Sequence, residues 1–458
     1  MKKLIITALS AAATAAAAAQ SLPETGYDDV TYSSIAYRYP TREDAAAHGQ
    51  GENDYRMKLQ IPSPVRSESG TRYSFAFDMP PVWLERDIML HTEGGRNSHI
   101  IYVNGIRAGS ARDSRLPSSF DITQALKDGG NSIDIIITPD TDEPESASAD
   151  PGRPASESVV LTARPRPGIE DVVVSAVPDS TGKHGILTVD IIVYNPYNYP
   201  EPITVGYDIY SPEKKLKTYD FREASVRARS RDTVRFEAPI YGTPERMWSA
   251  SSPKLYDLTL VTRKNGIITE YIPLRIGFTD TEWNGEGLLR NGLPEELKPV
   301  RYNAPQDMKT AEDDLKGIKK RGYNAVFPDY PQPGWFYDLT DRIGLYVIDR
   351  ANINSAHKPD GKQVGGTLAN NPRWKDEYTA RVKGMYYRSR NHPSVVAWAL
   401  GAPAGNGYNM YKAYQWLHEQ DSVRPVVFSG AAGEWNSDFE LPDAVDFDLL
   451  PPLAGRRR

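Results

Sequence analysis

The stretch Asn391-His392-Pro393-Ser394-Val395-Val396-Ala397-Trp398-Ala399-Leu400-Gly401-Ala402-Pro403-Ala404-Gly405-Asn406-Gly407 decides how the rest of the chain is interpreted. It begins with a polar turn and continues as a short apolar run that contains two adjacent valines and a tryptophan. It then ends in a loop of Gly, Pro and Ala. An apolar run of strand length between turn residues is typical of a buried strand. The stretch therefore predicts a buried strand that feeds a loop.

The size and composition of the whole chain limit the classes of protein to which it can belong. With 458 residues, the chain has room for roughly two to four domains with buried cores. It is 39% hydrophobic and 25% charged, with a formal net charge of −6, as in ordinary soluble globular proteins. A net negative charge gives no support to a nucleic-acid or anionic-membrane partner, so we expect neither.

The first residues have the order of a secretory signal peptide over residues 1–19. Met1–Lys3 is basic, Leu4–Ala19 is an apolar run that is short for a membrane span, and small and polar residues follow. We expect cleavage after Ala19 and no transmembrane segment. The chain has no cysteine, so we expect neither disulfides nor a lipid-bearing cysteine. These features predict an exported bacterial protein that is periplasmic or secreted.

The predicted secondary structure changes once along the mature chain, near Phe278. Up to Phe278 the sequence has strand-like runs, including one that ends in Asn104-Gly105, a dipeptide that reverses the chain between two strands. Alternating runs at 172–174, 187–193 and 203–209 have the spacing of an immunoglobulin-like β-sandwich, predicted over residues 169–279. Beyond Phe278, strands alternate with helical patterns, which predicts a parallel (β/α) TIM-barrel domain over residues 280–458.

Several segments resemble family 2 glycoside hydrolases, the β-galactosidase and β-glucuronidase group. Residues 390–401 are similar to R-N-H-P-S-V-x-x-W-S-L-G on the fourth barrel strand of that family. Residues 248–258 and 275–278 resemble its phrases W-S-P-x-x-P-x-L-Y-x-L and R-x-G-F, and residues 101–122 resemble its first domain. The resemblance implies a multidomain β plus α/β protein. It adds a jelly-roll sugar-binding domain over residues 20–168 before the sandwich and the barrel.

The resemblance also locates chemistry that this chain lacks. In the family, N-E-S-G follows the fourth strand and its Glu is the general acid/base, but Pro403 stands at that position here. A retaining glycosidase needs two carboxyl groups about 5 Å apart, and proline has no titratable group. In β-galactosidases, a Glu and a His after the third strand help to bind magnesium, and their counterparts here are Asn354 and Ala356. These side chains supply no charged oxygen, so we expect no metal site and no cofactor.

Two acids are candidates for relocated catalytic groups. Asp329 follows the second barrel strand, and its expected partner is Glu434 or Asp349. A simpler interpretation makes Asp329 a helix N-cap or a solvated loop acid. Amides and aromatic faces suit the hydroxyl-rich rings of sugars. We therefore predict carbohydrate contacts at five positions: Tyr330, Asn352, Asn354, Asn406 and Trp435.

The barrel pattern contains about six strands where a closed barrel has eight. The last one is predicted at Ala444–Leu449, and the seventh strand, which carries the nucleophilic Glu in the family, is not present in this sequence. We expect Trp398 to point into the barrel. An incomplete barrel exposes strand edges. We therefore expect a substitute closure, a partner protein or second copy that covers the edge, or a truncated product.

Together these features predict an exported family 2-like protein without ordinary retaining activity. Its expected role is carbohydrate binding, or service in a glycan-handling or envelope assembly. Two alternatives remain open. One is an active β-glycosidase of the β-galactosidase type with relocated carboxylates, and the other is an interaction scaffold that uses the open barrel edge.

Overall fold

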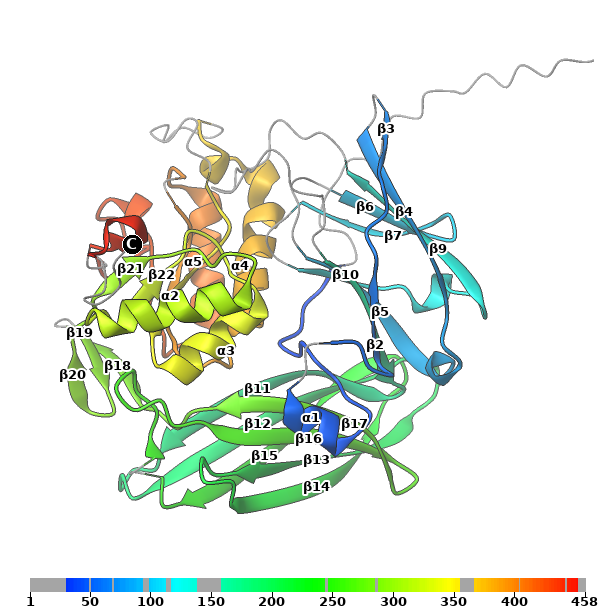
Figure 1. Cartoon of the computed structure of the whole chain (residues 1–458), viewed down its shortest axis with the longest axis horizontal. Coiled ribbons are helices and arrows are strands. Elements are labelled where there is room, and N and C mark those ends of the chain that lie inside the picture. Colours follow the sequence, from blue (N-terminus) through cyan, green and yellow to red (C-terminus); the bar gives the residue numbers. More distant parts are fainter. Residues whose placement is uncertain are drawn as a thin grey trace, which may run out of the picture.

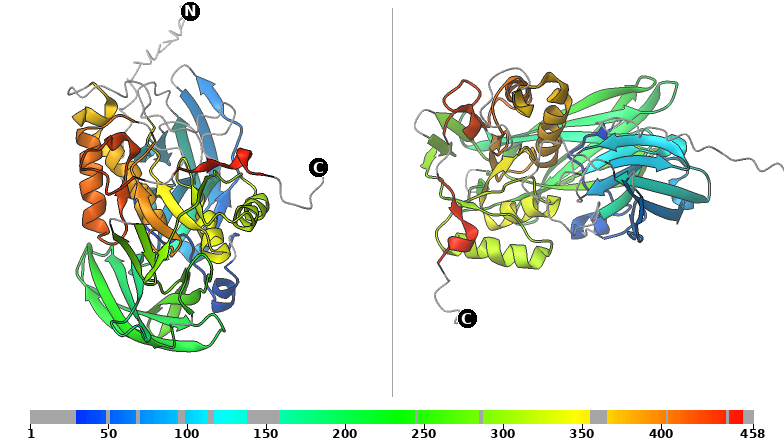
Figure 2. Two further views of the ribbon diagram at one scale, coloured as in Figure 1. Left: turned by 90° about the vertical axis from the view of Figure 1, so that its left-hand side faces the viewer. Right: turned by 90° about the horizontal axis from the view of Figure 1, so that it is seen from above.

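The structure is a computed structural model in which three domains pack against one another (Figures 1 and 2). It describes residues 30–48, 51–67, 70–93, 99–112, 117–137, 158–243, 246–284, 287–354, 366–402, 404–440 and 443–451. The predicted signal peptide, Ala356 and Pro403 lie outside these residues. None of the described helices is both long enough and apolar enough to cross a lipid bilayer.

The first domain is a sandwich of two five-stranded sheets with strand orders β3-β4-β9-β6-β7 and β1-β8-β5-β10-β2. The strands are β1 (Val30–Thr31), β2 (Arg56–Leu59), β3 (Val65–Ser67), β4 (Gly70–Asp78), β5 (Arg86–Glu93), β6 (His99–Val103), β7 (Ile106–Ala111), β8 (Ser118–Asp121), β9 (Gly130–Ile137) and β10 (Ser158–Pro165). The predicted reversal at Asn104-Gly105 joins β6 to β7. Its φ angles of 51° and 81° are those of a type I′ turn, which glycine favours at its second position.

The second domain is the predicted immunoglobulin-like sandwich, with sheets β11-β12-β15 and β14-β13-β16-β17. Its strands are β11 (Gly168–Pro178), β12 (His184–Asn195), β13 (Glu201–Tyr210), β14 (Leu216–Val226), β15 (Ser230–Tyr241), β16 (Tyr256–Lys264) and β17 (Ile267–Ile276). Strand β12 alternates strictly between half-buried and buried residues, and Leu187, Val189, Ile191 and Val193 face the core. This period of two is the physical basis of the sequence prediction.

The third domain contains a six-stranded parallel sheet of order β25-β24-β23-β22-β21-β26, next to a small sheet β18-β19-β20. The strands are β18 (Thr281–Asn284), β19 (Gly287–Arg290), β20 (Leu293–Glu295), β21 (Pro299–Arg301), β22 (Ala325–Phe327), β23 (Tyr346–Arg350), β24 (Val395–Ala399), β25 (Val426–Val427) and β26 (Val445–Asp446). The helices of the chain are α1 (Arg42–Ala47), α2 (Met308–Lys320), α3 (Gly334–Ile343), α4 (Lys375–Ser389) and α5 (Tyr408–Gln420). The sheet is an incomplete barrel with α2 to α5 on its outer face (Figure 1).

Trp398 points toward the helices, so the prediction that it faces the barrel centre is wrong. The pairing of β23 with β24 shifts by one residue, because Val347 pairs with Val395 while Ile348 pairs with Ala397. This bulge places Val396 and Ala397 together on the face opposite the helices. One inserted residue reverses the side-chain alternation beyond it. Trp398 is therefore buried in the layer between the sheet and the helices.

The β25 edge of the parallel sheet is partly covered by the chain itself. Beyond β25, the Asp438 N–H donates to the Val426 carbonyl (2.9 Å), and the Val426 N–H donates to Asp438 Oδ2 (2.6 Å). The Phe428 N–H donates to Ser437 Oγ (3.0 Å). The strand predicted at Ala444–Leu449 is shorter than expected, since only β26 is extended, and it pairs with β21 at the opposite edge. These bonds cap part of the β25 edge, and the closures expected from the sequence stay predictions.

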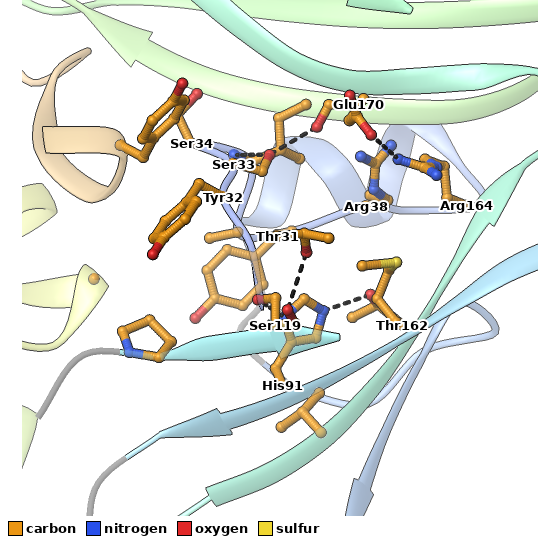
Figure 3. Close-up of a pocket in the computed structure, with 18 of the residues that line it drawn as sticks. Thr31, Tyr32, Ser33, Ser34, Arg38, His91, Ser119, Thr162, Arg164 and Glu170 are labelled. Atoms are coloured by element: carbon orange, nitrogen blue, oxygen red, sulfur yellow. Dashed lines mark hydrogen bonds and ion pairs between the residues drawn. The ribbon is translucent and has the colours of Figure 1, made fainter. Parts of the chain in front are cut away.

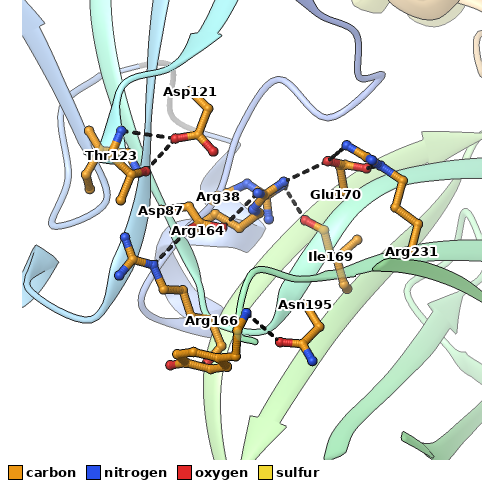
Figure 4. Close-up of polar contacts among 12 residues, drawn as sticks. Arg38, Asp87, Asp121, Thr123, Arg164, Arg166, Ile169, Glu170, Asn195 and Arg231 are labelled. Atoms are coloured by element: carbon orange, nitrogen blue, oxygen red, sulfur yellow. Dashed lines mark hydrogen bonds and ion pairs between the residues drawn. The ribbon is translucent and has the colours of Figure 1, made fainter. Parts of the chain in front are cut away.

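A layer of charged residues joins the first two domains (Figure 4). Arg164 donates to Asp87 Oδ2 (2.8 Å), and Arg166 donates to the other oxygen of the same carboxylate (2.6 Å). Arg38, on the segment that precedes α1, donates to the Ile169 carbonyl (2.7 Å). Since Asp87 is almost fully buried, its two guanidinium partners offset the cost of removing its charge from water.

A second junction ties the barrel to both other parts of the chain. Arg390, at the end of α4, donates to Asp171 Oδ2 (2.5 Å) and to the Val172 carbonyl (2.9 Å). Ser34 donates from its backbone N–H and its hydroxyl to Asp171 Oδ1 (both 2.8 Å). Asn391 donates to Ser34 Oγ (3.0 Å). Asn391, the first residue of the quoted stretch, and the preceding Arg390 therefore hold the domains together.

We expect Arg390→Met to destabilise the protein by about 3–5 kcal/mol, because it leaves the Asp171 carboxylate buried without its cation. Urea unfolding followed by tryptophan fluorescence measures the effect. In the double variant with Asp171→Asn, the loss should be smaller than the sum of the two single losses. Arg235→Gln removes an exposed partner 3.7 Å from Asp190 and should cost less than about 1 kcal/mol. An Arg390→Met variant as stable as Arg235→Gln would contradict this role of the junction.

Candidate functional site

The carboxyl ends of the parallel strands are the place where barrel enzymes carry their active sites. Asp329 follows β22, and its Oδ2 accepts from Asn303 Nδ2 (2.8 Å) while its Oδ1 accepts from Arg350 Nη1 (3.1 Å). The Asp329 N–H donates to Asn303 Oδ1 (2.9 Å). The N-cap of α3 is Pro333, so the interpretation of Asp329 as a helix N-cap is wrong. Asp329 is instead held in place by an amide and a guanidinium group.

A further carboxylate that the sequence analysis missed lies across a second arginine. The Arg301 guanidinium is 3.8 Å from Asp329 Oδ1 and 3.6 Å from Asp446 Oδ1. Asp446 reaches this place because β26 pairs in parallel with β21, with Arg301 opposite Asp446. No local pattern predicts the pairing of strands so far apart in the chain, so the sequence carried no signal for it.

Arg350 anchors this group from the end of β23. Its guanidinium is nearly buried and lies 3.8 Å from the centroid of the Phe327 ring. Burial lowers its pKa to about 10, and the Asp329 carboxylate opposes that shift. Arg350 therefore remains a cation at neutral pH, and the ion pair with Asp329 persists.

Asp349 is the neighbour of Arg350 but faces the opposite side of the sheet. Its Oδ2 accepts from Ser389 Oγ (2.6 Å) and its Oδ1 accepts from Tyr337 Oη (2.9 Å), side chains that belong to α4 and α3. The side chain is fully buried, and burial raises its pKa to about 6. Asp349 is therefore wrong as a partner of Asp329, because alternation along β23 directs it into the helix layer.

Glu434 belongs to a separate cluster on the loops after β24 and β25. Its Oε2 accepts from Tyr411 Oη (2.5 Å) and from Asn406 Nδ2 (3.2 Å). The hydrogen bond to Glu434 is the main reason why the pKa of Tyr411 rises to about 12. Asn436, which is fully buried, exchanges two hydrogen bonds with Asn406 (3.0 and 3.2 Å).

Trp435 gives this cluster an exposed aromatic face. Its side chain is 54% exposed, and its ring centroid lies 5.0 Å from that of Tyr411 and 5.4 Å from that of Tyr414. The structure thus brings together two of the predicted contact residues, Asn406 and Trp435, with Glu434. The sequence analysis missed Tyr411 and Asn436. Tyr411 follows Asn406 by five residues, and its position in the first turn of α5 was the available signal.

The other three predicted contact residues lie apart from this cluster. Tyr330 is half-buried beside Asp329, and its carbonyl accepts from Gln332 Nε2 (2.6 Å). Asn352 is almost fully buried, and its carbonyl accepts from Arg381 Nη1 (2.6 Å). Asn354 is half-buried at the end of a described segment. Their role in binding sugar stays a prediction.

The residues at the family's magnesium positions do not fit that ion. Asn354 is the only side-chain oxygen donor among Asn354, Ala356 and Pro403, whereas magnesium prefers carboxylate and water oxygens. Among the residues that the structure describes, no group of three or more His, Cys, Asp or Glu side chains is placed to hold a metal.

A large cavity of about 700 Å³ lies away from the strand ends, between the three domains (Figure 3). Residues 30–39 run along it, and Tyr32 and Ser33 face it beside Ser119 and Thr162 of the first domain. It also touches His392, which precedes β24. The cavity therefore reaches the amino end of that strand, whereas the acids described above follow the carboxyl ends.

His91 forms part of the cavity wall and is neutral. Its Nδ1 bonds with Ser119 Oγ (2.7 Å) and its Nε2 with Thr162 Oγ1 (2.8 Å), which Figure 3 shows. Burial, together with the nearby cations Arg56 and Arg38, lowers the pKa of His91 to about 3. At neutral pH this wall presents hydroxyl groups and an uncharged ring, and His91 does not act as a general acid there.

Comparison with known proteins follows the same division into three parts. Models of the glycosyl hydrolases family 2 match residues 10–143 (sugar binding domain), 168–278 and 301–444 (TIM barrel domain). The chain belongs to glycosyl hydrolase family 2. Its three parts occur in the order that the sequence analysis inferred from the motifs.

Family 2 relatives match the chain over most of its length. The β-galactosidase of Psychromonas ingrahamii is 27% identical over 460 residues, which cover 94% of this chain and 42% of that protein. The β-galactosidase of Enterobacter cloacae is 28% identical over 420 residues, or 88% of this chain and 38% of that protein. The chain therefore spans about two fifths of the length of these relatives.

Solved family 2 structures share the fold. β-Glucuronidase 2 of Bacteroides uniformis has a TM-score of 0.66 and 20% identity, covering 79% of this chain and 46% of that one. The β-glucuronidase of Parabacteroides merdae has a TM-score of 0.65 and 19% identity, covering 80% of this chain and 50% of that one.

We expect Asp349 to make stability fall as pH rises from 4 to 6. An unfolded Asp ionises near pH 3.9, whereas the folded carboxyl ionises near pH 6, so over this range the folded state holds more protons. The free energy of unfolding of the wild type minus that of Asp349→Asn should therefore decrease by about 2–3 kcal/mol and then level off. Urea titrations at pH 4, 5, 6 and 7 measure it. A difference for Asp349→Asn that increases with pH would refute the assignment.

Proposed function

We propose that this family 2 chain binds carbohydrate without hydrolysing glycosides. The observation that carries the proposal is the separation of its candidate catalytic acids. Asp329 is ion-paired with Arg350, and Asp349 faces the helices. Glu434 lies on the loop after β25 and bonds with Tyr411 of α5. A retaining glycosidase needs two carboxyl groups about 5 Å apart.

The strand order separates Asp329 from Glu434. Asp329 follows β22 and Glu434 follows β25, with β23 and β24 between them. Three strand spacings of about 4.8 Å come to about 14 Å along the sheet. Carboxyl groups that act on one glycosidic bond lie closer together than these two strand ends.

The cluster of Trp435, Tyr411, Glu434 and Asn406 is the proposed sugar-binding surface. An exposed indole face packs against the C–H face of a pyranose, and amide and carboxylate groups beside it pair with hydroxyls. Trp435 is the exposed member, while Tyr411 and Asn406 are fixed by their bonds to Glu434. A pre-positioned polar group loses less conformational entropy when a ligand binds.

Hydrolysis is the second candidate, and one observation favours it. Asp329 and Asp446 lie on either side of the Arg301 guanidinium. Inverting glycosidases use two carboxyl groups about 6.5–9.5 Å apart, a separation that an intervening guanidinium permits. Because the chain resembles β-galactosidases and β-glucuronidases, β-galactosides and β-glucuronides are the first substrates to test. We rank this candidate below binding, because Arg301 occupies the space between the two acids.

A scaffold role at the barrel edge has less support. The backbone groups of Val426 that an added strand would need are bonded to Asp438, and Phe428 N–H is bonded to Ser437. A docking strand must displace these bonds. We retain a carbohydrate ligand as the proposed partner, and the basic, apolar and small-residue order of residues 1–21 supports export as the proposed route to it.

We expect no release of aglycone from aryl β-galactosides, β-glucosides, β-glucuronides or β-mannosides by the folded wild type. The measurement is absorbance or fluorescence of the aglycone against a buffer blank. Turnover that Asp329→Asn or Asp446→Asn abolishes would replace binding with inverting hydrolysis by that pair. Turnover that Glu434→Gln abolishes would instead place the chemistry in the Trp435 cluster.

We expect Trp435→Ala to weaken sugar binding by about two- to tenfold, because stacking on an aromatic face contributes about 0.5–1.5 kcal/mol beyond buried area. A glycan array identifies a ligand, and calorimetry with that ligand compares the variants. Tyr219→Ala is the control, since Tyr219 is 63% exposed on β14 of the sandwich. Binding equal in Trp435→Ala and wild type would remove the cluster from the proposal, and an empty array would remove the sugar.

A further inference from the structure

A smaller pocket of about 210 Å³ lies on the seam between the jelly-roll domain and the sandwich. Its walls come from the start of β5, the link between β10 and β11, and the hairpin of β16 and β17. Four cationic side chains border it, Arg86, Arg166, Arg263 and Lys264, against one acid, Glu85. The chain as a whole has a net charge of −6, so this positive pocket is a local property.

Only part of that positive charge is neutralised by the protein. Arg166 donates to Asp87 Oδ1 (2.6 Å), as Figure 4 shows. Glu270 also acts electrostatically on Arg86, but its Oε2 is bonded to Arg38 (2.6 Å). In the part of the chain that the structure describes, Arg263 and Lys264 form no ion pair. The pocket therefore has more cationic than anionic groups.

Two guanidinium N–H groups at the pocket are buried without an acceptor. They are Nη1 of Arg86 and Nε of Arg263, which have no hydrogen-bond partner among the described residues. A buried donor without an acceptor is unfavourable and uncommon in folded proteins. Both nitrogens are covered by protein atoms, so they add to the cost of burying these two cations and do not themselves face the pocket.

Both guanidinium groups lie against aromatic rings. Arg86 lies 3.8 Å from the ring centroid of Tyr55, and Arg263 lies 3.7 Å from that of Phe221. A ring over the flat face of a guanidinium leaves its edge, which carries the N–H groups, for an acceptor in its plane. The edge of a guanidinium matches the oxygens of phosphate and sulfate in geometry and charge.

A backbone irregularity occurs at the same place. The pairing of β16 with β17 shifts between Thr262 and Arg263. Bulges of this kind redirect a side chain and are common next to functional sites. The shift occurs at the arginine whose Nε lacks an acceptor.

We propose that this pocket binds a small oxyanion, namely a phosphate or sulfate group. The group is either a free inorganic ion or an ester on a larger molecule, since both present the same tetrahedral oxygens. Arg86, Arg166 and Arg263 give the walls their positive charge, and Lys264 adds charge at the rim. The site is separate from the Trp435 cluster and does not depend on the function proposed for it.

The test is isothermal titration calorimetry of the full chain with inorganic phosphate and with sulfate, at an ionic strength fixed with sodium chloride. We expect saturable binding to the wild type and at least tenfold weaker binding to Arg263→Gln/Lys264→Gln. The matched control is Lys215→Gln/Arg235→Gln, which removes the same charge from the same domain at residues outside the pocket. The control and Trp435→Ala should both bind as the wild type does.

A comparison of glucose 6-phosphate with glucose distinguishes the two sources of the group. Binding of the ester but not of glucose shows that a larger molecule can present the phosphate, while binding of the inorganic ions alone restricts the pocket to free anions. Either result supports the oxyanion site. Equal weakening in the two double variants would show general charge screening and overturn the proposal. The absence of saturable binding of either ion to the folded wild type would overturn it as well.

Discussion

The buried ion pair of Asp171 and Arg390 is the contact on which the arrangement of the three domains depends. Asp171 belongs to the sandwich, Arg390 to the barrel, and Ser34, which donates twice to the same carboxylate, to the segment that leads into the first domain. Each charge is costly to bury alone, so the two are stable only together. One carboxylate thus fixes three parts of the chain that are distant in sequence.

This role explains why residues 390–392 keep the family pattern while the end of the quoted stretch does not. Arg390 and Asn391 bond with the sandwich, and His392 Nδ1 bonds with Asp341 (2.6 Å), so these side chains serve the framework rather than the strand ends. The end of the stretch has Ala402-Pro403-Ala404 where the family carries its acid/base. In a barrel, the residues that stabilise the sheet are separate from the loop residues at the carboxyl ends of its strands, which carry the active site. Chemistry can therefore change at the loop while the fold is preserved.

Short segments bond with the sheet on both sides. At one edge, the Asp438 side chain and backbone bond with Val426, and at the other edge β26 pairs with two residues of β21. Unpaired edge groups invite association with other chains, and local capping reduces that tendency. The pairing of β26 with β21 also brings Asp446 to Arg301, so the way the sheet ends decides which acids meet at the strand ends.

The sequence by itself determined the family, the order of the three parts and the type of the elements that it placed, because alternation along strands such as β12 and the quoted motifs are local signals. It also named Asn406, Glu434 and Trp435 as candidates, and the structure brings them together on two loops. Only the tertiary structure decided which way Trp398 and Asp349 face, which edge β26 occupies, and that Arg301 lies between Asp329 and Asp446. A one-residue bulge reverses a side chain, and pairing between distant strands leaves no local trace in the sequence. Both depend on contacts that form only when the chain is folded.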